Sequence, residues 1–291
     1  MISIHIENIK ENFMINKYIN NIDENSNYFI VTNNDEVLLI SSIKYLSWDS
    51  DIFNKKIGLY EIHHGEYSDS YNKKLFEQID EFCKKEGYNC IFTKVETTNY
   101  KNMHVLESCG YKIMDTIVTL KNENIDDYKI KLPDEYSYRI INNNDKLEVL
   151  DIIDNLYSYG RFFVDSNLDN EKVNELYKNW IINEIKNKEV DVLGIEKEGK
   201  LVGFISCKYR NICDIDEKQV VISLVGISKL SQGQGLGKIL MKYDIDNAKA
   251  KKIKKISVGT QIDNIKALNL YTSCGFKIES SISSFHKNYD I

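Results

Sequence analysis

The sequence predicts an α/β fold in which two related units, each a mixed sheet flanked by helices, follow one another and the first unit is degenerate. Three observations lead to this prediction. Runs rich in Val, Ile and Leu alternate with stretches of helical period throughout the chain. The hexapeptides Ser108–Ile113 and Ser273–Ile278 differ at one position, and each follows a strand and a helix in the same order. Finally, a glycine-rich turn at Gly233–Gly237 has no counterpart in the first half.

The boundary between the units is expected at Pro133, the one proline of the chain, which follows a polar run over residues 121–131. Residues 1–132 would then form the degenerate domain, and residues 133–291 the domain that carries the glycine turn. A chain of 291 residues is long enough for two domains of ordinary size.

Periodicity and glycine positions predict the main elements of both domains. In the first domain a helix is expected over Tyr71–Glu86, with Gly87 just after its end, followed by a strand over Asn89–Val95. In the second domain we expect helices Lys146–Tyr157, Asn170–Asn187 and Asn264–Ser273 and strands Val190–Ile195, Leu201–Tyr209, Val220–Ile227 and Lys255–Thr260.

The glycine turn joins a strand to a helix and therefore has the form of an anion-binding site. Leu236, Ile239, Leu240 and Tyr243 fall on one face of the following helix. Glycines leave backbone N–H groups uncovered, and a helix N-terminus adds partial positive charge. We therefore expect a diphosphate ligand. The spacing matches neither a P-loop nor a dinucleotide-binding fingerprint.

The turn reads Gln232-x-x-Gly235-x-Gly237, which resembles the Q/R-x-x-G-x-G/A signature of the GNAT acetyltransferases. The resemblance implies that the second domain is catalytic, that the loop holds the pyrophosphate of acetyl-CoA, and that backbone groups of the preceding strand pair with the pantetheine amides. It assigns cofactor binding to Val225, Ile227, Gln232, Gly233, Gln234, Gly235, Leu236, Gly237, Lys238 and Asn264.

Tyr271 is predicted to be the general acid that protonates the departing CoA thiolate. It lies two helical turns after Asn264, and a phenol with an ordinary pKa of about 10 is protonated at neutral pH. GNAT enzymes commonly place a Tyr here, although a purely structural Tyr271 is the alternative. Leu106 occupies the corresponding position of the first unit, whose turn at His64–Tyr71 has one glycine and two acidic residues. One cofactor per chain is therefore expected. A covalent role for Cys274 is disfavoured, because the residue recurs in the repeat.

The acceptor is predicted to be the amine of a nucleotide-linked amino sugar. Leu46–Phe53 and Gly160–Phe163 resemble segments of the TDP-fucosamine acetyltransferases, which N-acetylate a nucleotide-linked 4-amino-4,6-dideoxy sugar. Arg161 suits a phosphate, and Phe162 and Phe163 suit stacking on a base. A buried helix end is the alternative for these three residues.

Two other functions stay open: a GNAT enzyme acting on a protein N-terminus, a polyamine or a drug amine, and a non-catalytic CoA-binding module. Transfer is expected to be direct. Its general base is unassigned, with Asp115 and a water-mediated route both considered.

The amino-acid composition limits the kinds of binding partner that we expect. With 28% charged residues and a net charge of −6, the chain does not have the basic balance expected of a nucleic-acid-binding protein. It has no long apolar run and no signal-peptide pattern, so a cytoplasmic protein without a membrane span is expected. The six cysteines form no C-x-x-C pair, and His63 and His64 have no third ligand in view, so no metal is expected. Homodimerisation is left open.

Overall fold

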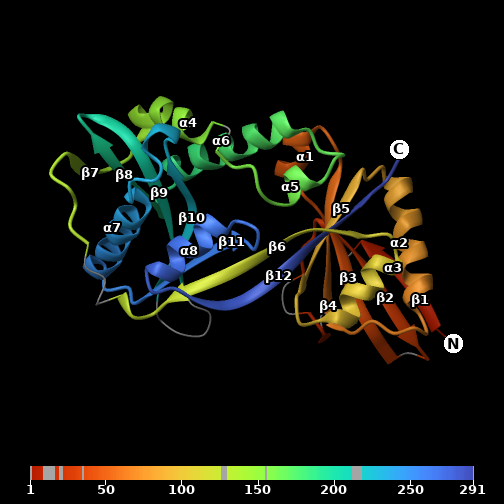
Figure 1. The fold of residues 1–291 in the computed structure, drawn as a ribbon. Coiled ribbons are helices and arrows are strands. Elements are labelled where there is room, and N and C mark those ends of the chain that lie inside the picture. Colours follow the sequence, from red (N-terminus) through yellow and green to blue (C-terminus); the bar gives the residue numbers. More distant parts are fainter. Residues whose placement is uncertain are drawn as a thin grey trace. The chain divides into compact units, whose positions relative to one another are not determined.

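The computed structural model describes residues 2–8, 17–19, 22–34, 36–125, 130–154, 156–211 and 218–290. The chain forms two compact units from interleaved segments: unit 1 contains Met1–Thr116, Val164–Asp169 and Ile282–Ile291, and unit 2 contains Ile117–Phe163 and Asn170–Ser281. Each unit is a mixed sheet covered by helices (Figure 1), which confirms the predicted α/β class. Among the described residues, no helix is long and apolar enough to cross a membrane.

Unit 1 contains a sheet in the order β1-β2-β3-β4-β5-β12, in which the β4–β5 pair is parallel and the other pairs are antiparallel. The helices and strands that begin in this unit are β1 (Ile2–Asn8), β2 (Ser26–Asn33), β3 (Glu36–Tyr45), α1 (Ser47–Phe53), β4 (Ile57–Gly65), α2 (Asn72–Glu86), β5 (Cys90–Glu96), α3 (Tyr100–Ser108) and β6 (Lys112–Asn122). Helix α2 matches its prediction to within one residue, and Gly87 ends it in the left-handed region (φ 74°).

Helices α2 and α3 cover one face of the unit 1 sheet (Figure 1). Alternation along β2 explains the arrangement: Phe29 and Val31 point into the core shared with both helices, whereas Tyr28 and Ile30 pack on the other face. From the helices, Leu75 of α2 is fully buried in that core. The sequence analysis did not predict β2, although Tyr28–Val31 is a continuous run of aromatic and β-branched residues, because the run shows no alternation between apolar and polar positions.

Unit 2 contains a sheet in the order β6-β11-β10-β9-β8-β7, in which β10 and β11 are parallel and the other pairs are antiparallel. Short 3-10 turns occur at Asn143–Asp145 and Lys229–Ser231. Its remaining elements are β7 (Tyr136–Ile140), α4 (Lys146–Ile153), α5 (Arg161–Val164), α6 (Asn170–Lys186), β8 (Val190–Lys197), β9 (Lys200–Asn211), β10 (Lys218–Ile227), α7 (Leu236–Ala250), β11 (Lys255–Gln261), α8 (Ile265–Ser273) and β12 (Lys277–Asn288).

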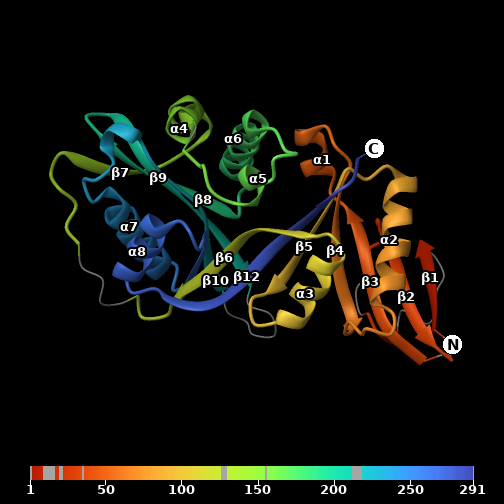
Figure 2. The ribbon, with the colours of Figure 1, turned by 45° about the vertical axis from the view of Figure 1, so that its right-hand side comes forward.

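The unit 2 sheet lies between two helical layers. In Figure 2, α4 and α6 lie on one side of β8 and β9, and α7 and α8 lie on the other. Neighbouring residues on β9 divide between the layers, because Phe204 packs with α4 and α6 while Ile205 packs with α7. This strand is therefore buried on both faces.

The last strand of each sequence repeat completes the sheet of the other unit. Strand β6 follows α3 of unit 1, but its residues Ile117–Asn122 pair with β11 of unit 2. Strand β12 follows α8 of unit 2, but its residues Ile282–Asn288 pair with β5 of unit 1. The compact units thus do not follow one cut in the chain, and the domain boundary at 132/133 stays a prediction about the repeats. Residues 126–129 of the predicted linker lie outside the described part.

Candidate active site

The glycine turn forms an open backbone cradle at the start of α7. Gly233 and Gly235 both have φ 78°, in the left-handed region that a side chain disfavours, and Gly235 is the N-cap of the 15-residue helix. A Cβ added at either glycine would meet no atom within 4 Å. Backbone N–H groups ahead of the first helical turn have no partner inside the helix. The turn therefore offers both the space and the donors that a diphosphate requires.

Side chains next to the cradle hold the loop in place. Gln232 donates through Nε2 to the Ile227 carbonyl at 3.2 Å, and the Gln234 amide oxygen accepts from the Tyr136 hydroxyl at 2.9 Å. Leu236 is 1% exposed, so only its backbone can face a ligand. At Gly237 a Cβ would come within 3.0 Å of a Leu270 methyl, so this glycine lets α7 approach α8. Lys238 is exposed beside the cradle.

Strands β10 and β11 pair over a short stretch only. The parallel pairing runs from Gln219 to Ile222 on β10, and an irregularity in the β10–β9 register follows between Ile222 and Leu224. Such a bulge shifts the side-chain alternation by one residue. Accordingly Ile222 packs with α7, whereas Leu224, two positions later, packs on the opposite face with α4 and α6.

Beyond the bulge, the backbone groups of Val225 and Ile227 point away from β9. The Ser228 N–H donates to Val202 at 2.9 Å, which fixes the phase of the antiparallel ladder and leaves Val225 and Ile227 at its non-bonded positions. Side chains confirm this phase, because Tyr157 donates to the Val225 carbonyl at 3.0 Å and Gln232 to that of Ile227. The N–H groups of both residues therefore point toward the side on which β11 has diverged.

Tyr271 is a buried, neutral phenol on α8. Its side chain is 5% exposed and its ring contacts Phe276, with the ring centroids 6.0 Å apart. Burial, reinforced by the neighbouring Cys274, raises its pKa above the ordinary value of a tyrosine. The group is therefore protonated at any physiological pH, as a hydrogen-bond donor to a thiolate must be.

Asn264 caps α8, which begins at Ile265. Its Oδ1 accepts from the Ala267 N–H at 3.2 Å. Asn99 caps α3 of unit 1 in the same way, accepting from the Asn102 N–H at 3.1 Å. The cap thus recurs in the unit that has no glycine turn, and the contact of Asn264 with a cofactor stays a prediction.

Tyr157 contacts the strand that leads into the glycine turn, and the sequence analysis did not single it out. It was expected at the end of a helix over Lys146–Tyr157, but α4 ends at Ile153 and Tyr157 lies in the following loop. Its hydroxyl contacts β10 at Val225, its ring stacks on Tyr177 at 4.5 Å, and its pKa is raised by burial and by the nearby Tyr271. The sequence signal was one Tyr among 19, so only the fold could single it out.

The three residues predicted to bind the acceptor are the first three residues of the short helix α5, and they belong to unit 2. The Arg161 guanidinium lies 4.4 Å from the centre of the Phe162 ring, and Phe162 is buried. Phe163 is partly buried. Acceptor binding by Arg161, Phe162 and Phe163 stays a prediction. Asp115, considered as the base, lies on β6 in the part that belongs to unit 1.

The described cysteines are free thiols, and all except Cys109 are buried; Cys213 lies outside the described residues. The Cys274 carbonyl accepts from the Asn122 side chain at 3.0 Å, and the following residue, Gly275, has φ 86°. Gly110 in unit 1 has φ 84°, so the repeated Cys-Gly pair marks the left-handed end of a helix. This is a structural explanation for the motif.

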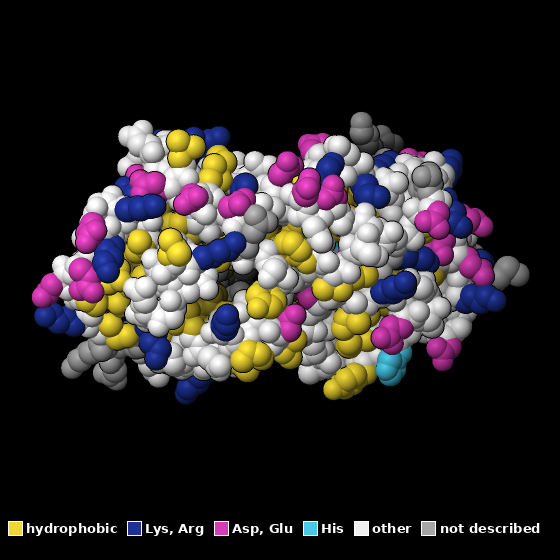
Figure 3. Space-filling model, turned by 45° about the horizontal axis from the view of Figure 1, so that its top comes forward, with side chains coloured by type: hydrophobic (Ala, Val, Ile, Leu, Met, Phe, Trp, Pro, Cys, Tyr) yellow, Lys and Arg dark blue, Asp and Glu magenta, His cyan; other side chains and the backbone are white. Residues whose placement is uncertain are grey.

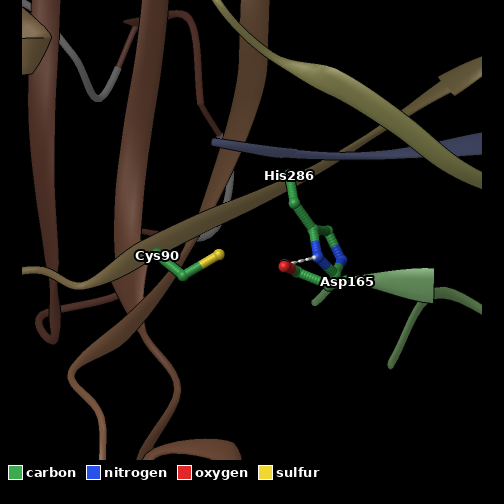
Figure 4. A group of neighbouring side chains, drawn as sticks. All are labelled: Cys90, Asp165 and His286. Carbon is green, nitrogen blue, oxygen red and sulfur yellow. Dashed lines mark hydrogen bonds and ion pairs between the residues drawn. The ribbon is translucent and has the colours of Figure 1, made fainter. Parts of the chain in front are cut away.

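A second polar cluster is buried in unit 1 (Figure 4). Cys90 of β5, His286 of β12 and Asp165 bring their ligand atoms within 4.8 Å of one another. His286 Nδ1 is 2.8 Å from Asp165 Oδ2, and Asn167 and Asn288 also donate to this carboxylate. Although burial would raise the pKa of Asp165, these hydrogen bonds lower it, so the carboxylate is ionised.

The cluster tethers the segment Val164–Asp169 to β12 within unit 1. Because N–H donors already contact both oxygens of Asp165, a hydrogen-bonded clamp explains the arrangement without a metal ligand role for the carboxylate. The expectation that the protein uses no metal remains a prediction.

On the face shown in Figure 3, basic and acidic side chains are interspersed, and neither sign of charge forms a continuous patch.

The chain is similar to known proteins at the level of one domain and of the whole fold. Residues 153–276 match the model of the acetyltransferase (GNAT) family. The matched range contains β10, the glycine turn and α8. The chain is also similar to the spore coat polysaccharide biosynthesis protein SpsD of Bacillus subtilis (strain 168). The two are 20% identical over 241 residues, covering 82% of this chain and 80% of the relative.

Solved structures share the fold. A tandem GNAT protein from the clavulanic acid biosynthesis pathway superposes with a TM-score of 0.61 at 10% identity, covering 90% of this chain and 82% of that chain. A GCN5-related N-acetyltransferase from Sphaerobacter thermophilus gives a TM-score of 0.61 at 12% identity, with coverage of 92% and 82%. At these identities the likeness concerns the fold, and it agrees with the predicted tandem.

Proposed function

We propose that this chain, which carries a GNAT acetyltransferase domain and uses acetyl-CoA as its acetyl donor, moves the acetyl group directly to the amine of a nucleotide-linked amino-dideoxy sugar. The observation that carries the proposal is the diverging end of β10, where backbone N–H groups point away from β9 just before the open glycine turn that begins α7. Sugar as acceptor is supported by the likeness to a protein named for polysaccharide biosynthesis.

The residues of unit 2 fit the cosubstrate. The N–H groups around Gly233, Gly235 and Gly237 would hold the pyrophosphate, with the exposed Lys238 beside it. The backbone of Ile227 would pair with a pantetheine amide as a strand pairs with an extended chain, and Val225 would meet the thioester end of the same arm. The thioester supplies an activated acetyl carbonyl and a good leaving group.

Two groups of the protein would act on the developing charges. As the neutral amine attacks, the carbonyl oxygen becomes negative, and the Val225 N–H would donate a hydrogen bond to it. As the C–S bond breaks, Tyr271 would give its proton to the departing sulfur, since its raised pKa keeps the phenol protonated. The amine proton leaves to solvent, and the Tyr271 phenolate takes a proton back from solvent, so that the products are the amide and the free thiol. Arg161 and Phe163 would contact the nucleotide.

Thiol release from acetyl-CoA, measured with a panel of amines, tests the proposal. The panel contains nucleotide-linked 4-amino-4,6-dideoxy sugars, nucleotide-linked 2-amino sugars, polyamines and peptides with a free N-terminus. We expect stimulation by the 4-amino sugars alone. Stimulation by peptides or polyamines in their place would assign a different acceptor, and no stimulation by any amine would favour a non-catalytic CoA-binding module.

A further inference from the structure

Resting on the proposed function, we propose that Tyr157 is an acceptor-binding residue: its phenol oxygen accepts a hydrogen bond from the acceptor amine and aims the nitrogen at the thioester carbonyl. The residue lies in the loop between α4 and α5. The loop also leads into the residues that we expect to contact the nucleotide, Arg161 and Phe163.

The position of the phenol carries the argument. Its hydroxyl is 3.0 Å from the carbonyl oxygen of Val225, whose N–H we assign to the thioester oxygen. In an extended strand the N–H and C=O of one residue point to the same side. The hydroxyl therefore lies on the side of β10 where the acetyl group would be bound. Tyr271, the predicted general acid, is close enough to Tyr157 to contribute to its raised pKa.

The chemistry separates the two phenols. Tyr157 gives its one proton to the Val225 carbonyl, which leaves the lone pairs of its oxygen able to accept. The partner that suits an accepting oxygen is an N–H of the amine. Tyr271 instead has no proton acceptor in the hydrogen bonds found among the described residues, so its proton is available for the thiolate.

A chain of packed groups fixes the ring of Tyr157. It stacks on Tyr177 with the planes 22° apart, and Tyr177 stacks on Trp180 with the planes 8° apart. Trp180 donates to the buried Glu184 at 2.9 Å, and Glu184 also accepts from Ser206 of β9. The hydroxyl is thus held between α6 and β10, as positioning a small nucleophile requires.

Steady-state kinetics of Tyr157→Phe test the proposal, with the best nucleotide amino sugar of the panel as acceptor. Losing one hydrogen bond should raise the acceptor KM about tenfold, which corresponds to about 1.4 kcal/mol. The acetyl-CoA KM and the calorimetric affinity for CoA should change less than about twofold. Tyr159→Phe is the matched control, because Tyr159 is an exposed phenol in the same loop.

Each outcome bears on the idea. An unchanged acceptor KM in Tyr157→Phe overturns it, and so does an equal loss of CoA affinity, since the phenol would then act on the cofactor through Val225. In the control Tyr159→Phe, the acceptor KM, the CoA affinity and the slow acetyl-CoA hydrolysis without acceptor should all stay as in the wild-type chain. A wild-type chain that acetylates no sugar would instead refute the proposed function.

Discussion

Both units contain the same strand divergence, but they differ in the turn that comes after it. In unit 1, β4 and β5 pair in parallel only over Ile57–Leu59, as β10 and β11 of unit 2 pair only over Gln219–Ile222. In each unit the first strand of the diverging pair is followed by a turn and then by a helix, which is α2 after β4 and α7 after β10. The turn before α7 is glycine-rich, whereas the turn before α2 ends on Tyr71, which takes the N-cap position that Gly235 holds in unit 2.

Unit 1 fills its turn with its own side chains. Tyr67 is 2% exposed and, together with Tyr60 and Tyr111, packs its ring around Phe76 of α2. The Ser68 N–H is satisfied by the Asn72 side chain at 2.8 Å. The first unit therefore keeps the scaffold of a cofactor site, while aromatic rings and a side-chain amide occupy the places that unit 2 leaves to glycines.

Giving the unit 2 turn a side chain should have the largest effect. Gly235→Asp adds a side chain at φ 78° and a negative charge where the diphosphate would be bound. Calorimetry should show one CoA bound per wild-type chain. In Gly235→Asp the CoA affinity should fall at least about 100-fold. The control is Gly199→Asp in the β8–β9 turn, where φ is 76° and a Cβ also meets open space. Normal CoA affinity in Gly235→Asp would remove the loop assignment.

Replacing the phenol that unit 1 lacks should have the next largest effect. Leu106 takes its place on α3, so Tyr271→Phe makes unit 2 resemble unit 1 chemically. Turnover should fall about 100-fold or more while CoA affinity stays within about twofold. Because the pKa of Tyr271 is raised, its deprotonation should not limit turnover below about pH 10. Tyr243→Phe on α7 is the control, and equal losses in both variants would point to packing.

A smaller effect concerns one carboxylate at the same place in both units. Asp80 and Asp244 each stand nine residues after the N-cap of α2 or α7. Asp80 binds Lys287 at 2.6 Å and Tyr289 at 2.8 Å. Asp244 is fully buried beside the Cys207 thiol, a weak donor, and burial raises its pKa to about 7.

Protonation of Asp244 should therefore make stability depend on pH. The folded-state pKa lies above the ordinary unfolded value of about 4, so the fold retains a proton that the unfolded chain loses between about pH 4 and 7. The free energy of unfolding should decline over this range, by up to about 4 kcal/mol, and level off above it. In urea titrations at several pH values, Asp244→Asn should flatten the decline. If Asp244→Asn keeps the wild-type dependence of the unfolding free energy on pH, that dependence arises from other groups.

Much of the fold could be predicted because it depends on local patterns. The apolar period of α2, the glycine after its end and the repeated hexapeptide each predicted an element or a relationship that the structure contains. The open turn at Gly233 and Gly235 was equally local. One prediction was wrong, because the helix expected to reach Tyr157 ends at Ile153. Strand β2 was not predicted, because its continuous apolar run lacks the alternation that marks a half-buried strand.

The sequence by itself determined the α/β class, the tandem repeat, the glycine cradle and a phenol two turns along the next helix, because spacing along one chain fixes backbone conformation and helix face. The tertiary structure alone decided which strands complete each sheet, that Tyr157 bonds to β10, and that His286 holds Asp165 121 residues away in the chain. Those contacts join segments distant in sequence, and such pairings follow from packing and the burial of polar groups rather than from any local residue pattern.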